Sequence, residues 1–230
     1  VTMVGQEILR GKQVSEGPVS ADDWLNVTVS LLMHDVGYIR GVCGGDDHPN
    51  ARYLTGDGDT MVRADEGATD AFLAPYHVDR GKIAVRERFS NQPLLDVESI
   101  CSNIERTRFP VPNNPESLIT DDYAGLVRAA DLIGQLSDPQ YPQKHAALFY
   151  EFQETGAAAK MGYKTPADIG RHYPAFYWGS VNDHLKDGLT HLRRTQDGQA
   201  VVAGLFTHVF NEEHSESVYG PARQPLRSVK

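Results

Sequence analysis

A long apolar segment that ends in a histidine and an aspartate most constrains the fold of this 230-residue chain. Ser20 is a good N-cap residue, and the predicted helix that follows, from residue 21 to about residue 38, is apolar on almost every face. We expect such a helix to be the buried central helix of the fold. Its His34-Asp35 pair then needs partners, because a buried imidazole and carboxylate are costly. A metal ion satisfies both side chains at once, and stabilisation of His34 by the helix dipole is the alternative.

Most of the remaining chain is also expected to be helical, so the predicted fold is all-α, a single helical bundle with long loops. Residues 41–70 are rich in Gly and Asp and are expected to be irregular, and residues 201–210 fit either a helix or a strand. We place the domain at residues 1–211 and a polar tail at residues 212–230. Further helices are predicted at about 1–12, 80–90 with Asp79 as its cap, 96–106, 120–136, 142–154, part of 166–173 up to an interruption at Pro174, and from there to about 194.

The composition argues against several classes of function. The chain has 22 basic and 31 acidic residues, which gives a net charge of −9 and disfavours general nucleic-acid binding and a polybasic membrane surface. No apolar run approaches the ~20 residues that span a bilayer. The two cysteines, Cys43 and Cys101, lie far apart and form no disulfide scaffold, so we expect a reduced, cytoplasmic compartment.

A second carboxylate stands out in the predicted helix 120–136. Asp131 interrupts an otherwise apolar and small-residue face, and Arg128 and Gln135 share its surface at i−3 and i+4. An ion pair of Asp131 with Arg128 at the surface is one interpretation, and it would contribute only a few tenths of a kcal/mol. A buried ligand is the other.

The two motifs together resemble a known family. LLMHDVG (residues 31–37) followed far along the chain by RAADLIGQ (residues 128–135) is similar to the HD-domain metal-dependent phosphohydrolases. The resemblance implies an all-helical fold in which a first His, a His-Asp pair and a distal Asp bind one or two divalent metals. His34 and Asp35 match the pair and Asp131 the distal Asp, with Asp35 as the bridge if two metals bind. The likeness extends over about residues 1–155 and includes Glu151-Phe152, a pair typical of the cyclic-nucleotide phosphodiesterase branch.

Three features depart from the family pattern. Residues 1–33 contain no His, so we expect the first His ligand to precede Val1. The phosphodiesterases have a His four residues after the histidine of the pair, where this chain has Tyr38. The glycine-tyrosine-proline signature of the cyclic-di-GMP branch is absent. The resemblance therefore names no particular substrate, and it does not distinguish among Mn, Mg, Zn, Ni and Fe.

A third group of residues concentrates a histidine and two cations near a predicted helix start. His77, Arg80 and Lys82 lie in the segment PYHVDRGK. Backbone amides at a helix start and basic side chains both suit a phosphate group. We expect these three residues to bind the phosphate or to protonate the leaving group. In the alternative interpretation, His77 and Asp79 cap the helix and the cations are solvated.

These features predict hydrolysis of a phosphate ester by a metal-activated water. The expected partner is a small phosphorylated substrate such as a nucleotide or a cyclic nucleotide, without general nucleic-acid or membrane binding, and a homo-oligomer is compatible with the sequence. A di-iron oxygenase on the same scaffold is one alternative, since His and carboxylate ligands also suit iron. A non-catalytic signalling or binding domain is another, favoured by Tyr38 and by the missing first His.

Overall fold

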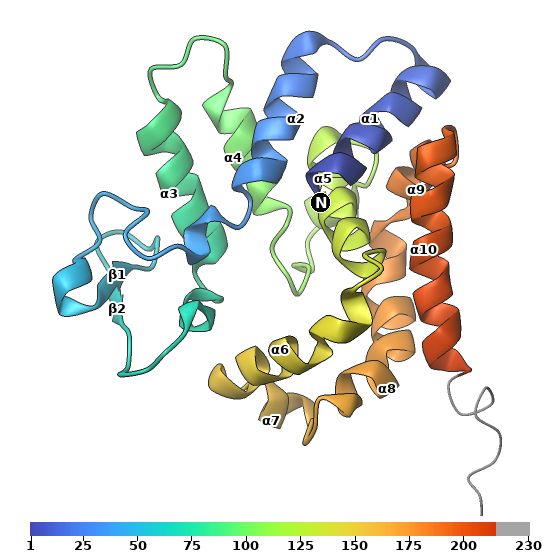
Figure 1. Cartoon of the computed structure of the whole chain (residues 1–230). Coiled ribbons are helices and arrows are strands. Elements are labelled where there is room, and N and C mark those ends of the chain that lie inside the picture. The colour runs from blue at the N-terminus through green and yellow to red at the C-terminus, as the bar shows by residue number, and fades with distance from the viewer. Residues whose placement is uncertain (215–230) are drawn as a thin grey trace, which may run out of the picture.

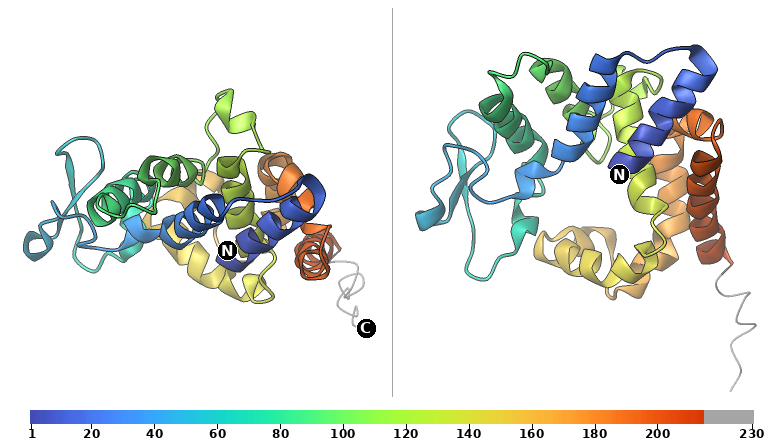
Figure 2. Two further views of the ribbon diagram at one scale, coloured as in Figure 1. Left: turned by 90° about the horizontal axis from the view of Figure 1, so that it is seen from above. Right: turned by 45° about the horizontal axis from the view of Figure 1, so that its top comes forward.

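Helices make up most of residues 1–214, the part of the chain that the computed structural model describes. Figures 1 and 2 show the helices and a single small hairpin that projects from them, so the predicted all-α class is confirmed. In chain order the α-helices are α1 (Thr2–Glu16), α2 (Ala21–Met33), α3 (His77–Phe89), α4 (Val97–Glu105), α5 (Tyr123–Leu136), α6 (Tyr141–Glu154), α7 (Ala157–Met161), α8 (Ala167–Phe176), α9 (Lys186–Leu192) and α10 (Gln196–Glu213).

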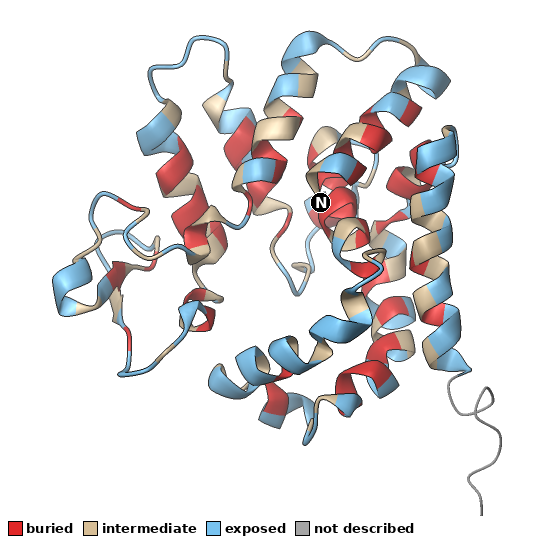
Figure 3. Ribbon diagram, in the orientation of Figure 1, coloured by how far each residue is buried: buried red, intermediate tan, exposed pale blue. Residues whose placement is uncertain are grey.

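The central helix of the fold is α5. Ten of its 14 residues are buried, against three of 13 in α2. Its small residues let α1, α2, α4, α9 and α10 pack closely around it, and Figure 3 shows the resulting band of buried positions. The prediction that the helix ending at His34 is the buried central one is therefore wrong. Leu32 of α2 is 65% exposed, and the helix ends at Met33 rather than near Tyr38.

The chain turns sharply after His34 through a short 3-10 helix, η1 (Val36–Tyr38). This turn packs against the first residues of α3 so closely that Gly37 has no room for a side chain. A Cβ atom at Gly37 would lie 1.9 Å from the carbonyl oxygen of His77. Glycine is therefore required here, and the close approach brings the end of α2 beside the start of α3.

The segment predicted to be irregular contains a two-stranded antiparallel hairpin, β1 (Arg52–Leu54) and β2 (Met61–Arg63), in which Tyr53 lies opposite Val62. Three further 3-10 helices accompany the hairpin and the later loops. They are η2 (His48–Asn50), η3 (Asp70–Leu73) and η4 (Glu116–Leu118). The hairpin thus corrects one part of the predicted loop at residues 41–70.

A buried arginine holds this hairpin region onto α3. The guanidinium of Arg80 donates through Nε to the Gly37 carbonyl at 2.7 Å. Its Nη1 donates to Asp46 and to the Leu54 carbonyl at 2.9 and 2.7 Å, and its Nη2 to Asp46 and the Ile39 carbonyl at 2.9 and 3.1 Å. All five N–H donors are therefore used, and the Arg80 side chain is 0% exposed.

Several boundaries differ from the prediction. α3 begins at His77, so Asp79 lies in its first turn and does not cap it. Pro174 lies inside α8, which then continues through a π-helix, η5 (Tyr177–Val181), and a 3-10 helix, η6 (Asn182–His184). Residues 201–210 are helical, and α10 runs past the predicted boundary at 211; residues 215–230 of the predicted tail lie outside the described residues. Within residues 1–214, no helix combines the length and the apolar character that a membrane crossing requires.

Candidate functional site

Three of the predicted site residues meet where α2 ends against α5. His34 directly follows α2, Asp35 begins the turn into η1, and Asp131 lies in the middle of α5. The Nε2 atom of His34 is 3.2 Å from an oxygen of Asp35 and 3.2 Å from an oxygen of Asp131. The structure thus brings together two motifs that lie far apart in the sequence.

Neighbouring groups fix the orientation of these side chains. The Nδ1 atom of His34 lies 2.9 Å from the Leu31 carbonyl, to which it donates, so Nε2 is the atom that faces the carboxylates. Gln135 donates to Asp131 at 2.7 Å from the next turn of α5. Nε2 points between its two carboxylate neighbours and makes no well-aligned hydrogen bond to either. The cluster is therefore ordered by its surroundings, with one buried nitrogen left between two oxygens.

The charges in the cluster shift the pKa values of its members. Burial lowers the pKa of His34, but the carboxylates of Asp131 and Asp35 outweigh burial and raise it to about 10. Burial raises the pKa of Asp35, but His34 and, more weakly, His77 lower it. Their combined effect exceeds that of burial, so the pKa of Asp35 lies below its ordinary value. Burial, together with the charges of Asp35, Glu151 and Asp131, raises the pKa of Tyr38 to about 12. The site thus has the excess of negative charge that favours a cation.

His77 also lies beside this cluster. Its Nε2 atom is 4.0 Å from an oxygen of Asp35, and its Nδ1 atom lies 2.6 Å from the Ala74 carbonyl. The ring of Tyr38 stacks on the ring of His77, with centroids 4.4 Å apart and planes 19° from parallel. Tyr38 therefore helps to position the ring of His77.

The other two predicted catalytic residues point elsewhere. Arg80 has no free donor for a phosphate, because Asp46 and three backbone carbonyls take all five. The ammonium of Lys82 lies 2.9 Å from Asp79 and 2.5 Å from Glu105 on α4. Lys82, five residues after His77, lies on another face of α3. Arg80, three residues after His77, shares its side of the helix, but its hydrogen bonds to Gly37, Asp46 and Leu54 hold the guanidinium away from the cluster. Arg80 and Lys82 are therefore not part of the cluster.

The donor atoms of this cluster are of the kinds that divalent cations bind. Two ligand atoms bound about 2.1 Å from one ion at right angles lie about 3.0 Å apart, close to both 3.2 Å spacings of His34 Nε2. The buried Nε2 without a well-aligned hydrogen bond is the atom that a metal would take. In residues 1–214, no three His, Cys, Asp or Glu side chains are already arranged as a complete metal site. The fit therefore rests on the two spacings and on the chemistry of the donors.

The first residue of the chain lies close to this cluster. A Cβ atom at Gly134 would lie 2.8 Å from the backbone nitrogen of Val1 and 2.5 Å from its Cα atom. Gly134 is three residues after Asp131 on α5, so Val1 packs within one turn of the predicted ligand.

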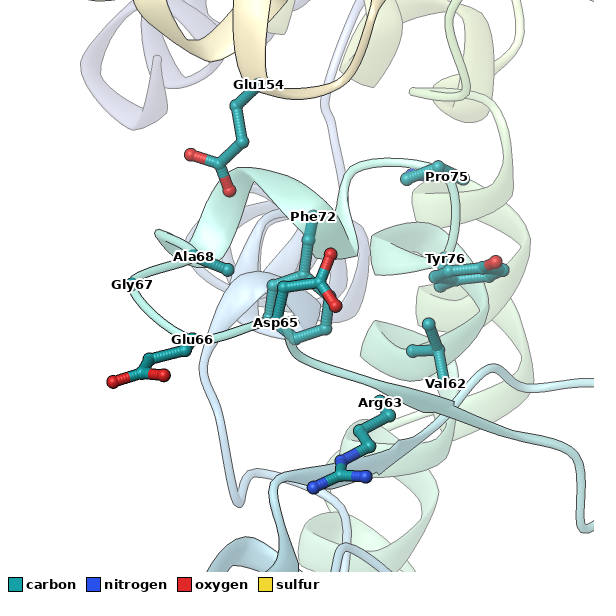
Figure 4. A pocket seen from close by; sticks show the side chains of 10 residues that line it. All are labelled: Val62, Arg63, Asp65, Glu66, Gly67, Ala68, Phe72, Pro75, Tyr76 and Glu154. Carbon is teal, nitrogen blue, oxygen red and sulfur yellow. The ribbon is translucent and has the colours of Figure 1, made fainter.

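Two cavities lie outside the cluster. One, of about 470 Å³, lies beside the hairpin, where Glu154 of α6 reaches toward Ala68 (Figure 4). The other, of about 780 Å³, lies at the starts of α2, α4 and α5. Both are lined by several carboxylates, which disfavours a phosphate group. The carboxylates are Asp65, Glu66 and Glu154 in the first cavity, and Asp22, Asp23, Asp96 and Asp122 in the second.

The position of Arg128 differs from one interpretation of the sequence. An Asp131–Arg128 surface pair was one interpretation of the α5 motif, but Arg128 is buried and its guanidinium points toward the Ile119 carbonyl instead. The role of Tyr38 was also missed, although its position four residues after His34 was already noted as a departure. Stacking partners such as His77 cannot be found from local sequence, because they come from another element.

The fold and the site define an all-helical protein with a buried histidine–carboxylate cluster at the junction of three helices. The Npun_R2479-like family model matches residues 1–215, and the chain belongs to this family. No curated protein and no solved structure matches the chain.

Proposed function

We propose that this protein hydrolyses a phosphate ester of a small molecule, such as a nucleotide or a cyclic nucleotide, at a divalent metal centre. The observation that carries the proposal is the position of His34 Nε2, 3.2 Å from both Asp35 and Asp131. Two carboxylates and an imidazole of this kind are the ligands that hold catalytic divalent metals.

The exposure of each side chain in the cluster suggests its role in binding the metal. His34 and Asp131 are each 9% exposed in their side chains and would be fixed ligands. The side chain of Asp35 is 54% exposed and keeps an oxygen available for a second cation or a water. A bound metal lowers the pKa of its water and neutralises charge on the phosphoryl group. His77, held by the Ala74 carbonyl and by Tyr38, is placed to contact the phosphate or to donate a proton to the leaving oxygen.

Metal content tests this proposal directly. We would measure metal identity and stoichiometry by elemental mass spectrometry, on the chain as given and on a chain extended upstream of Val1. Hydrolysis would then be assayed with phosphomonoesters, phosphodiesters and nucleotides, with each metal in turn. The substitution Asp131→Asn removes a ligand charge at nearly constant volume. Asp59→Asn, at an exposed position in the hairpin loop, is the matched control.

We expect one or two divalent ions per chain and metal-dependent hydrolysis, both lost in Asp131→Asn and kept in Asp59→Asn. Absence of hydrolysis on every ester tested, with the metal bound, would refute the proposal. Two irons with consumption of dioxygen would replace it by the oxygenase. No metal in either chain length would identify His34 and Asp35 as structural residues.

A non-catalytic binding domain is the second candidate. It is favoured by the replacement of the expected histidine by Tyr38, whose stacking on His77 fills space at the site. In residues 1–214 no complete set of metal ligands is preassembled, which also favours it. Retention of the fold without bound metal, in the chain extended upstream of Val1, would support this candidate over hydrolysis.

A further inference from the structure

A buried arginine one turn before Asp131 lacks the partners that a buried charge needs. Arg128 is only 2% exposed, and its Nη2 atom makes one long hydrogen bond, 3.4 Å, to the Ile119 carbonyl. Its Nε and Nη1 atoms are buried and find no acceptor in residues 1–214. Because Nε carries one N–H and Nη1 carries two, at least three of the five donors are unused.

The charge of Arg128 is not balanced by its surroundings either. Arg106 is its cationic neighbour, and Asp122 is its acidic neighbour, which already pairs with Arg106 at 2.7 Å. Burial and the charge of Arg106 lower the pKa of Arg128 to about 10, so the guanidinium still carries its charge at neutral pH. An uncompensated buried charge costs several kcal/mol. Ordered water can accept the free N–H groups, but it supplies no counter-charge.

We propose that Arg128 anchors an oxyanion site that takes a phosphate or a carboxylate group of a small ligand. An oxyanion provides both the missing acceptors and the missing negative charge, and guanidinium donors match its geometry well. Arg106 adds positive charge nearby, which strengthens the preference for an anion. Burial and the charge of Arg128 lower the pKa of His184, and a bound anion would offset the effect of Arg128.

The segment that covers Arg128 is one that a ligand can displace at low cost. It connects α4 to α5, and its Ile119 carbonyl makes the single contact to the guanidinium. Of its large apolar side chains, Leu118 is 74% exposed, whereas Ile119 and Phe109 are 43% and 42% exposed and Phe109 packs against Phe176. The part around Leu118 and Ile119 can therefore move with a limited loss of apolar contact, and Arg106, which donates to the Glu116 and Ile119 carbonyls, remains as its tether.

The position of Arg128 places this site on the same helix as the candidate metal centre. Arg128 lies three residues before Asp131, so their Cβ atoms are about 5–6 Å apart, but its guanidinium points toward Ile119, ahead of the start of α5. The identification of the oxyanion as a phosphate of the substrate rests on the proposed function, whereas anion binding at Arg128 does not. The two can therefore fail separately.

Thermal unfolding of the metal-free protein tests the proposal. We would compare the parent chain, Arg128→Met and Arg86→Met in chloride, acetate and inorganic phosphate at equal ionic strength, with a chelator present. Arg86 is the control, because it is a surface arginine paired with Glu98 at 2.7 Å. Phosphate at ten times its Kd should shift the folding equilibrium of the parent about ten-fold, a rise in Tm of roughly 3–5 °C.

We expect phosphate to produce this rise in the parent and in Arg86→Met but not in Arg128→Met. In chloride, Arg128→Met should unfold at the same temperature as the parent or higher, because an unpaired buried charge has been removed. A response to acetate alone would identify a carboxylate ligand and would still support the site. Arg128→Gln, which keeps polar donors without the charge, replaces Arg128→Met if that variant does not fold.

Two results would overturn the proposal. One is the absence of any anion-dependent rise in the parent chain. The other is an equal rise in all three proteins together with a lower Tm of Arg128→Met in chloride, which would make Arg128 a structural residue. Metal content of Arg128→Met, measured in parallel, should match that of the parent. If the parent binds no metal but responds to phosphate through Arg128, the proposed hydrolysis fails while the oxyanion site stands.

Discussion

Two regions of the molecule each contain a fully buried arginine, but only one of them supplies acceptors for all of its N–H donors. Around Arg80, the turn after α2 and the hairpin supply three carbonyls, and the loop between them supplies the carboxylate of Asp46, for its five donors. Around Arg128, the α4–α5 connection supplies one carbonyl at 3.4 Å. Both side chains are almost unexposed, at 0% and 2% of the residue.

This difference in hydrogen bonding corresponds to a difference in how the two regions are stabilised. The hairpin region has a small apolar core, centred on Tyr53 and Leu73, and Arg80 joins its irregular backbone by charge and hydrogen bonds. The helices around α5 have the largest apolar core and do not need Arg128 to hold them together. A satisfied buried arginine therefore indicates a structural role, and an unsatisfied one beside a large core indicates a role toward something that binds.

The largest expected effect comes from breaking the Arg80 network. Arg80→Met leaves the carboxylate of Asp46 buried, with its side chain 1% exposed, without its cation. Loss of one partner of a buried ion pair typically costs about 3–5 kcal/mol, so we expect the free energy of unfolding to fall by that amount. Urea denaturation measures it. A second substitution, Asp46→Leu, should restore part of the stability, and a loss below about 1 kcal/mol in Arg80→Met would contradict the structural role.

A somewhat smaller loss is expected where the two regions meet. Gly37→Ala places a Cβ atom 1.9 Å from the His77 carbonyl, so either η1 or α3 must move. Overpacking of this kind costs about 1–3 kcal/mol. The shift should also separate Asp35 from His77 and reduce metal binding, measured by calorimetry. Gly179→Ala is the control, because its Cβ atom would meet nothing within 4 Å, and we expect no comparable loss there.

Acid should weaken the hairpin region before the helical core. Burial raises the pKa of Asp46, but the Arg80 guanidinium and the backbone amide of Leu54 outweigh burial and hold it below its ordinary value of 3.8. The stability that Asp46 contributes is therefore complete above about pH 4 and is lost as pH falls through the lower, folded-state pKa. Hydrogen exchange of hairpin and α5 amides from pH 5 downward measures this. Asp46→Asn should remove that pH dependence, and simultaneous opening of both regions at each pH would contradict it.

A fourth prediction concerns His34, which lies between the two regions. Because Asp131 and Asp35 raise its pKa to about 10, its ring should stay protonated through pH 8 in the chelator-treated protein. Asp131→Asn removes one of these charges and should lower that pKa by about 1–2 units. Proton NMR of the imidazole gives the titration curve, and Asp59→Asn should leave it unchanged.

The protonated ring of His34 also determines how the stability of the protein changes with pH. A raised folded-state pKa contributes stability that is complete below pH 6.5 and is lost as pH rises through about 10. The metal-free protein should therefore lose stability between about pH 7 and pH 10, and less so in Asp131→Asn. An identical loss in both proteins would mean that Asp131 does not stabilise the imidazolium.

The sequence predicts the local features of this fold well. The predicted cap Ser20 does cap α2, by accepting from the Asp23 amide, whereas the predicted cap Asp79 lies inside the first turn of α3. Caps and apolar spacing are properties of a few consecutive residues, and so they can be read without the tertiary structure. The all-α class follows from them.

What the sequence does not show is which distant residues meet. The pairing of Arg80 with Asp46 and the stacking of Tyr38 on His77 join separate elements. The apolar character of α2 was misleading as well, because burial depends on how many neighbours cover a helix and not only on its own residues. The motif pattern predicts that His34, Asp35 and Asp131 belong together, and the structure places them close to one another. Arg80 was expected at the site because basic side chains at a helix start suit a phosphate, and its pairing with Asp46 could not be read from that segment.

The smallest expected change in stability is at Arg86, an arginine at the surface. Arg86 donates two parallel hydrogen bonds to Glu98, at 2.8 and 2.7 Å, and its side chain is 49% exposed. Exposed pairs gain little because water screens the charges and both side chains lose mobility. Arg86→Met should therefore leave the denaturation midpoint unchanged within error, and any small loss should vanish at high salt. A salt-resistant loss as large as that of Arg80→Met would show that hydrogen-bond geometry, and not burial, decides how much an arginine contributes to this fold.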